Sequence, residues 1–118
     1  SPWAAPLSWL VPPRLAMEIL LTGDPIDADR ARDLGLVNHV VDAADLRDHA
    51  RNLARRIAAN APLSVLASKR TAYLSAQFPI AQAYEKAEEI WEPVYMSADA
   101  QEGPAAFREK RTPEWKGR

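Results

Sequence analysis

Residues 97–118 read SADAQEGPAAFREKRTPEWKGR, and this stretch does most to decide the fold. It opens on Ser97, a residue type that caps helices because its side-chain oxygen accepts a free backbone N–H. We expect the helix that follows to end near Arg111, although Gly103-Pro104 can split it or delay its start. A basic turn and Trp115 come next, and Trp115 is expected to be exposed unless another subunit or domain covers it.

Toward the N-terminus, apolar residues recur at helical spacing in five more segments. Prolines stand where they can open a helix, since a proline at the first helical position loses only an N–H that has no partner there. Asp27 and Asp42 are suitable N-caps, Gly23 a suitable left-handed C-cap, and Pro93 is expected to kink its helix. The predicted helices open at Pro12-Pro13 and end at Gly23, then cover residues 28–34, about 43–59 and 62 to about 75, and the last of them runs from Pro79 through Tyr95.

Leu36 to Val41 is a short β-prone run. A lone strand has no partner within the chain for its N–H and C=O groups, so a missing part, a second chain or solvent must satisfy them. Residues 1–12 are apolar and rich in proline, and we expect an irregular lead-in there. The predicted fold class is therefore mainly α, with a helical region over residues 13–118 and one short strand near 36–41.

The composition excludes several classes of function. With 47% hydrophobic residues, 26% charged residues and a net charge of −1, the sequence is typical of a soluble globular protein and does not attract nucleic acid. It has no cysteine, which excludes disulfides and a Cys nucleophile and fits a reducing compartment, so we expect a cytoplasmic location. His39 and His49 show no ligand spacing, so no metal site is predicted. No apolar run approaches the ~20 residues that cross a membrane.

Three stretches together carry a resemblance to a known family. They are residues 21–28 (LTGDPIDA), residues 35–41 (GLVNHVV) and residues 97–118. In this order and spacing they resemble the C-terminal part of the enoyl-CoA hydratase/isomerase (crotonase) superfamily, from about Arg14 onward. The resemblance implies the helical, trimerisation-type region of a crotonase-like α/β fold, and therefore the back half of an enzyme.

The resemblance also implies where catalysis takes place. In this superfamily two backbone N–H groups hold the enolate oxygen of a thioester, and glutamates activate water or move protons. Both belong to the part of the family that precedes this region, so no catalytic residue is predicted here and the chain alone should be inactive. The whole enzyme would add water across the double bond of an acyl-CoA or shift that double bond. The superfamily's other reactions remain open alternatives. Glu18, Glu88, Glu89 and Glu92 are expected to be solvated helix acids.

Two residues match family positions that contact coenzyme A, which enters as part of the substrate, so no separate cofactor is implied. Lys110 matches a lysine that approaches the phosphates, and an ammonium on a flexible stem suits a phosphate. Trp91 matches an aromatic position against the adenine, where a π-face can stack. The structural alternatives are a solvated Lys110 and a Trp91 that fills the core.

The family also implies a homo-oligomer, a trimer or a dimer of trimers, in which these helices reach the acyl-CoA of a neighbouring subunit. No nucleic acid or membrane partner is expected. The alternative is a non-catalytic helical module that self-associates through the apolar stripe of residues 80–95.

Overall fold

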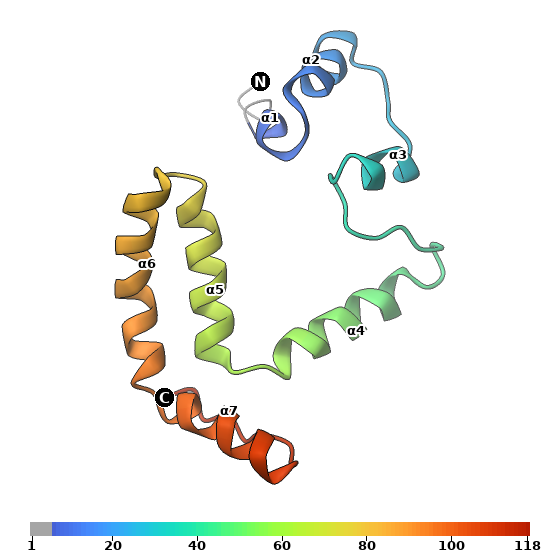
Figure 1. The fold of residues 1–118 in the computed structure, drawn as a ribbon. Coiled ribbons are helices and arrows are strands. Elements are labelled where there is room, and N and C mark those ends of the chain that lie inside the picture. The colour runs from blue at the N-terminus through green and yellow to red at the C-terminus, as the bar shows by residue number, and fades with distance from the viewer. Residues whose placement is uncertain (1–5) are drawn as a thin grey trace. The chain divides into compact units, whose positions relative to one another are not determined.

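The computed structural model describes residues 6–118, which contain seven helices and no strand (Figure 1). The predicted mainly α class is thus confirmed. The chain divides into two compact units, residues 1–49 and residues 50–118. The helices are α1 (Leu7–Leu10), α2 (Pro13–Thr22), α3 (Ala28–Asp33), α4 (Leu46–Ala58), α5 (Pro62–Ser75), α6 (Ile80–Tyr95) and α7 (Ala98–Glu109).

The first unit begins with α1, which packs against α2. Helix α1 is a single turn inside the stretch predicted to be irregular, while residues 1–5 of that stretch lie outside the described part. Helix α2 starts at Pro13 and buries Ala16, and Gly23 ends it in the left-handed conformation with a φ of 69°. Both ends of this helix were correctly predicted, because proline and glycine mark them directly.

Helix α3 is capped at both ends by local hydrogen bonds. The Asp27 carboxylate accepts the Arg30 N–H at 2.7 Å, as predicted. At the other end Gly35 has a φ of 78°, and the Leu36 N–H donates to the Ala31 carbonyl at 2.9 Å, which makes a Schellman turn. The turn therefore uses the start of the β-prone run to cap a helix.

The strand predicted over residues 36–41 does not form in the described chain. Its composition favours a strand, but a strand needs a neighbour to exchange backbone hydrogen bonds, and residues 6–118 supply none. Helix α4 also differs from its prediction. It begins at Leu46 and not at 43, because the Asp45 N–H donates to the Asp42 carbonyl at 2.9 Å and closes a turn first.

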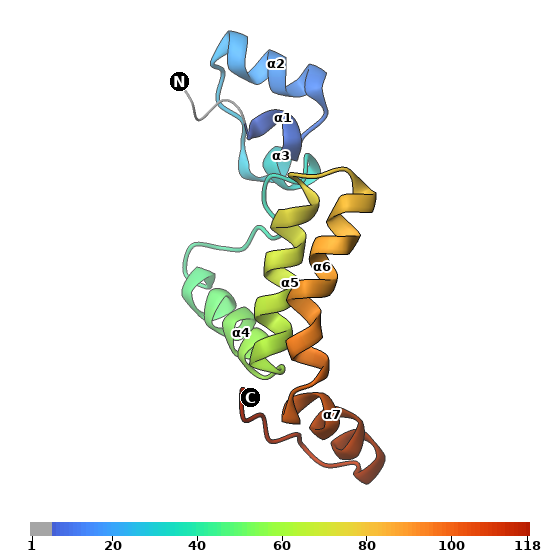
Figure 2. The ribbon, with the colours of Figure 1, turned by 90° about the vertical axis from the view of Figure 1, so that its left-hand side faces the viewer.

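In the second unit, α5 and α6 pack side by side as an antiparallel pair (Figures 1 and 2). Their buried residues, Ala67, Ala83 and Val94, are small, so the two helices approach closely over a thin core. Helix α6 continues past Pro93 and ends only two residues later.

Ser97 joins α6 to α7. Its hydroxyl donates to the Val94 carbonyl at 2.6 Å and accepts the Ala100 N–H at 3.2 Å, so one buried side chain ends one helix and starts the next. This is the N-cap predicted from the sequence. Helix α7 is not split at Gly103-Pro104 and ends at Glu109.

Candidate functional site

Lys110 lies immediately after α7, where the chain reverses. Its φ of 54° is left-handed, its N–H donates to the Phe107 carbonyl at 3.3 Å, and the Arg111 N–H donates to the Ala106 carbonyl at 3.0 Å. These bonds make a second Schellman turn, with lysine at the position that Gly35 occupies after α3. Its side chain is exposed, and its ammonium has no partner among residues 6–118.

The left-handed backbone at Lys110 is unusual for its residue type. Among residues 6–118 every other residue with a positive φ is a glycine. A side chain in this conformation costs about 1 kcal/mol, because its Cβ crowds the following carbonyl. The rest of the turn must therefore hold Lys110 in place, and a glycine there would remove the strain together with the charge.

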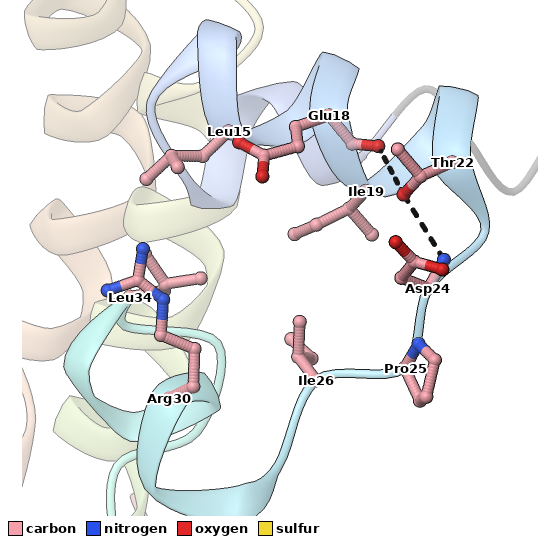
Figure 3. A pocket seen from close by; sticks show the side chains of 9 residues that line it. All are labelled: Leu15, Glu18, Ile19, Thr22, Asp24, Pro25, Ile26, Arg30 and Leu34. Atoms are coloured by element: carbon pink, nitrogen blue, oxygen red, sulfur yellow. Dashed lines mark hydrogen bonds between the residues drawn. The ribbon is translucent and has the colours of Figure 1, made fainter.

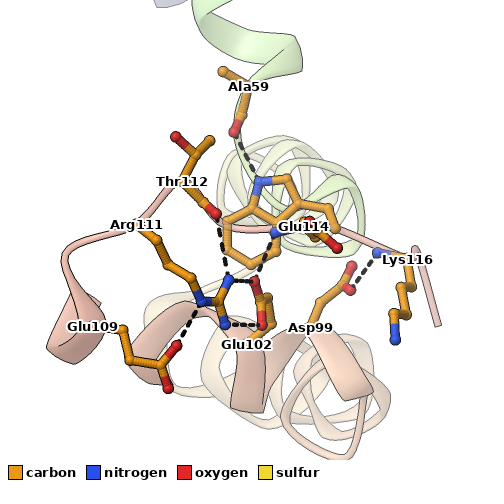
Figure 4. Close-up of polar contacts among 9 residues, drawn as sticks. Ala59, Asp99, Glu102, Glu109, Arg111, Thr112, Glu114 and Lys116 are labelled. Atoms are coloured by element: carbon orange, nitrogen blue, oxygen red, sulfur yellow. Dashed lines mark hydrogen bonds and ion pairs between the residues drawn. The ribbon is translucent and has the colours of Figure 1, made fainter. Parts of the chain in front are cut away.

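After Lys110 the tail runs back along α7 (Figure 4). The carboxylate of Asp99, which is only 4% exposed, accepts the N–H groups of Lys116 and Gly117 at 2.7 and 2.9 Å. The carbonyl of Arg118 accepts the N–H of Ala98 at 2.8 Å. The last three residues are thus fastened to the first turn of α7.

An ion pair fastens the near end of the tail. Arg111 binds Glu102 through two parallel hydrogen bonds of 2.5 and 2.9 Å, and its Nε donates to Glu109 at 2.6 Å. Glu102 also accepts the N–H of Glu114 at 2.7 Å. We call this arrangement the C-terminal clasp. It consists of the tail, residues 111–118, together with the Glu102–Arg111 ion pair and the Asp99 contacts that hold it.

The clasp changes the acidity of Glu102. The hydrogen bonds from Arg111 and then from the Glu114 N–H stabilise the carboxylate and lower the pKa of Glu102 from its ordinary 4.5 to about 2. The same pairing, with a contribution from Glu109, raises the pKa of Arg111. Glu102 therefore stays ionised across the physiological range.

We expect the stabilisation that Glu102 provides to be lost in acid. Because its folded pKa is lowered, the contribution is complete above pH 4.5 and declines as the pH falls toward 2. The difference in melting temperature between the parent chain and Glu102→Gln should therefore be constant above pH 4.5 and shrink below it. A difference that does not change across this range would contradict an ionised Glu102 in the clasp.

Trp115 is half-buried by contacts within the chain itself, so part of its ring is covered without another subunit or domain. Its indole N–H donates to the Ala59 carbonyl at 2.8 Å, at the end of α4. Its ring lies over Gly103, where a Cβ would meet it at 3.5 Å. The glycine expected to disturb α7 thus lies where the tail tryptophan packs against the helix.

Trp91, the second predicted ligand residue, is half-buried on α6. Its indole N–H donates to the Thr71 hydroxyl of α5 at 3.0 Å. Its ring stacks on Tyr95, with centroids 5.7 Å apart and an angle of 28° between the planes. These contacts link α5 to α6. Trp91 lies on α6, whereas Lys110 follows α7.

The first unit holds a shallow pocket of about 180 Å³ (Figure 3). Side chains of α2, α3 and their connection line it, and Ile19 faces Ile26 across it (Figure 3). The Thr22 hydroxyl donates to the Glu18 carbonyl at 2.8 Å, a hydrogen bond within the part of α2 that lines the pocket. Two acids, Glu18 and Asp24, and one base, Arg30, line the pocket.

The other helix acids also lie on the surface. Glu88, Glu89 and Glu92 are exposed on α6, as expected of solvated helix positions. Residues 6–118 hold no group of three or more side chains that could bind a metal, and the rings of His39 and His49 meet edge to face at 4.9 Å. No helix in this range is long and apolar enough to cross a membrane.

Sequence reasoning singled out Lys110 but missed Asp99 and Glu102, which hold the tail beside it. Their spacing of three places both acids on one face of α7. That pattern was visible, but acids at this spacing are common on exposed helices. Only the return of the tail shows what these two acids bind.

Known proteins resemble this chain along most of its length. Residues 5–118 match the model of the enoyl-CoA hydratase/isomerase family. A carnitinyl-CoA dehydratase of Proteus mirabilis is 42% identical over 112 residues, which are 92% of this chain and 43% of that protein. The corresponding protein of Escherichia coli K12 is 39% identical over 113 residues, with the same coverage.

Solved structures agree with the sequence matches. An enoyl-CoA hydratase of Mycobacterium tuberculosis superposes with a TM-score of 0.92 at 40% identity, over 98% of this chain and 46% of that one. An enoyl-CoA hydratase of Bacillus anthracis superposes with a TM-score of 0.94 at 33% identity, over 98% of this chain and 45% of that one. The chain spans less than half the length of these relatives. By sequence and by fold, it belongs to the enoyl-CoA hydratase/isomerase family.

Proposed function

We propose that this chain is the C-terminal part of an enzyme that adds water to, or removes water from, an acyl-CoA thioester. The family match over residues 5–118 carries this proposal. It is supported by relatives named carnitinyl-CoA dehydratase and enoyl-CoA hydratase, names that denote dehydration or hydration of a CoA compound. The groups that carry out the chemical step would lie outside this chain. The enzyme would work in the cytoplasm.

Within that enzyme, the chain would supply part of the surface that binds coenzyme A. Lys110 is suited to this because its ammonium is exposed and has no partner among the described residues. A glycine would occupy its turn without strain, so a lysine there needs another reason, and binding a phosphate is such a reason. Coenzyme A is a substrate group, so no further cofactor is proposed.

The chain would also contribute contacts between subunits of a homo-oligomer, a trimer or a dimer of trimers. Large apolar side chains are exposed on the second unit, among them Met96 at 83% and Phe107 at 86%. A surface of this kind is usually covered by a partner. The non-catalytic self-association module remains the alternative. It would associate through the stripe of residues 80–95, on which Ile80, Tyr84 and Tyr95 are exposed, and would need no coenzyme A.

We expect Lys110→Ala, in the assembled full-length enzyme, to weaken acyl-CoA binding by ~1–2 kcal/mol, which is about 5- to 30-fold. The reason is the loss of a charge-assisted contact with phosphate at a partly solvated position. The kcat should hardly change, because the nucleotide is remote from the reacting carbons and binds equally in the ground and transition states. Steady-state kinetics with calorimetric measurement of coenzyme A binding would test this.

Lys69→Ala is the matched control, since Lys69 is an exposed lysine on α5 and its loss removes the same charge elsewhere. A KM that is unchanged by Lys110→Ala over a range of salt concentrations would exclude Lys110 from the binding surface. An enzyme that binds no coenzyme A at all would favour the self-association module.

A further inference from the structure

Two adjacent basic residues differ sharply in how they are held. Three nitrogens of Arg111 bind carboxylates, two of them the carboxylate of Glu102 and one that of Glu109. Lys110 has no side-chain partner among residues 6–118. The Arg111 guanidinium therefore binds within the protein, while the neighbouring Lys110 ammonium can bind a ligand.

The backbone of Lys110 is fastened on both sides. The Schellman turn binds the N–H group of Lys110, and that of Arg111 directly after it, to the last turn of α7. After it, Glu102 binds both the Arg111 guanidinium and the Glu114 N–H, at 2.5 and 2.7 Å. Since one carboxylate holds two points of the tail, its loss would loosen the chain that follows the turn and remove the support that this chain gives to Lys110.

We propose that Glu102, acting through Arg111, is a positioning residue that holds Lys110 in its left-handed conformation and so places the ammonium for a phosphate of coenzyme A. This inference rests on the proposed role of Lys110. A flexible lysine loses freedom when it binds, and a backbone that is already fixed reduces that loss. It also explains how a strained conformation persists at a residue that is not glycine.

Kinetics of the full-length enzyme with two substrates test the inference. One substrate is the acyl-CoA, and the other is the same acyl group on pantetheine, which lacks the nucleotide and its phosphates. Glu102→Gln should raise the KM for the acyl-CoA by about three- to tenfold at unchanged kcat, and leave the KM for the pantetheine thioester unchanged. Arg111→Lys, which keeps the charge but loses the paired hydrogen bonds, should act in the same direction.

A double-mutant cycle separates positioning from general stability. If Glu102 acts through Lys110, Glu102→Gln should have no further effect on acyl-CoA binding once Lys110 is alanine. Glu88→Gln is the matched control, because it neutralises an exposed glutamate of α6 and should change neither KM. Thermal melting of each variant shows whether it folds, and if Glu102→Gln does not, Arg111→Lys serves in the same cycle.

The outcomes distinguish this inference from the proposed function. If Lys110→Ala weakens acyl-CoA binding but Glu102→Gln does not, or if the two effects simply add, Glu102 is not a positioning residue and the role of Lys110 stands. If Glu102→Gln raised the KM equally for the acyl-CoA and for the pantetheine thioester, the inference would also be overturned, because the change would be a general effect on the fold. If Lys110→Ala has no effect, the proposed function of Lys110 fails and the positioning role fails with it.

Discussion

The isolated chain, purified and given crotonyl-CoA, is expected to hydrate it no faster than buffer does. Hydration needs prearranged donors for the enolate oxygen and a carboxylate that activates water, and the loss of one such donor alone typically costs about a hundredfold or more in kcat. The helix acids Glu88, Glu89 and Glu92 are exposed and converge on no such site. An absorbance assay that follows the enoyl thioester would give the rate.

The full-length enzyme, tested in the same assay, is the positive control, since it must turn over if the family reaction is hydration. Saturable turnover by the isolated chain, abolished by Glu88→Gln or Glu89→Gln, would mean that the chemistry lies within residues 1–118 after all.

Trp91→Ala is expected to destabilise the second unit by about 3 kcal/mol, the low end of the range for a buried tryptophan. The change removes the ring that stacks on Tyr95 and the hydrogen bond to Thr71 that links α6 to α5. Chemical denaturation would measure the loss in free energy of unfolding. A loss below about 1 kcal/mol would show that the ring contributes little to packing.

Trp91→Phe separates packing from a contact with adenine. Phenylalanine keeps a π-face but cannot donate to Thr71, so it should cost about 1 kcal/mol of stability. Thr71→Val is the matched control, because it removes the same hydrogen bond from the other helix and leaves Trp91 in place. If Trp91→Phe raises the KM for acyl-CoA while Thr71→Val does not, the ring also contacts the ligand; if neither does, Trp91 serves the fold alone.

Much of the helical architecture could be predicted because single residues mark its boundaries. Pro13, Gly23, Asp27 and Ser97 act through the backbone within a few positions, so their effect does not depend on the rest of the protein. The run of residues 36–41 is the opposite case. A β-prone composition becomes a strand only beside another strand, and the described chain has none to offer.

The candidate site could be predicted only in part, for a similar reason. The resemblance identified Lys110, but a lysine by itself does not predict a left-handed turn, and the contacts that Glu102 makes with Arg111 and Glu114 span nine and twelve residues. Trp115 was misjudged because its partner, Ala59, is 56 positions distant. Most helix caps are local and could be predicted, although Asp42 closes a turn before α4 and does not cap it, whereas the tail contacts are distant and could not.

The hydrogen bond from Trp115 to Ala59 has a consequence for the order of folding. It closes a loop of 56 residues, whereas the bonds between the tail and α7 close loops of only 9 to 20. By the chain entropy of loop closure the longer loop costs about 1 kcal/mol more, so the tail should dock on α7 first. The indole would then reach the end of α4 after the tail has docked, so the contact between the tail and α4 would form late in the assembly of this unit.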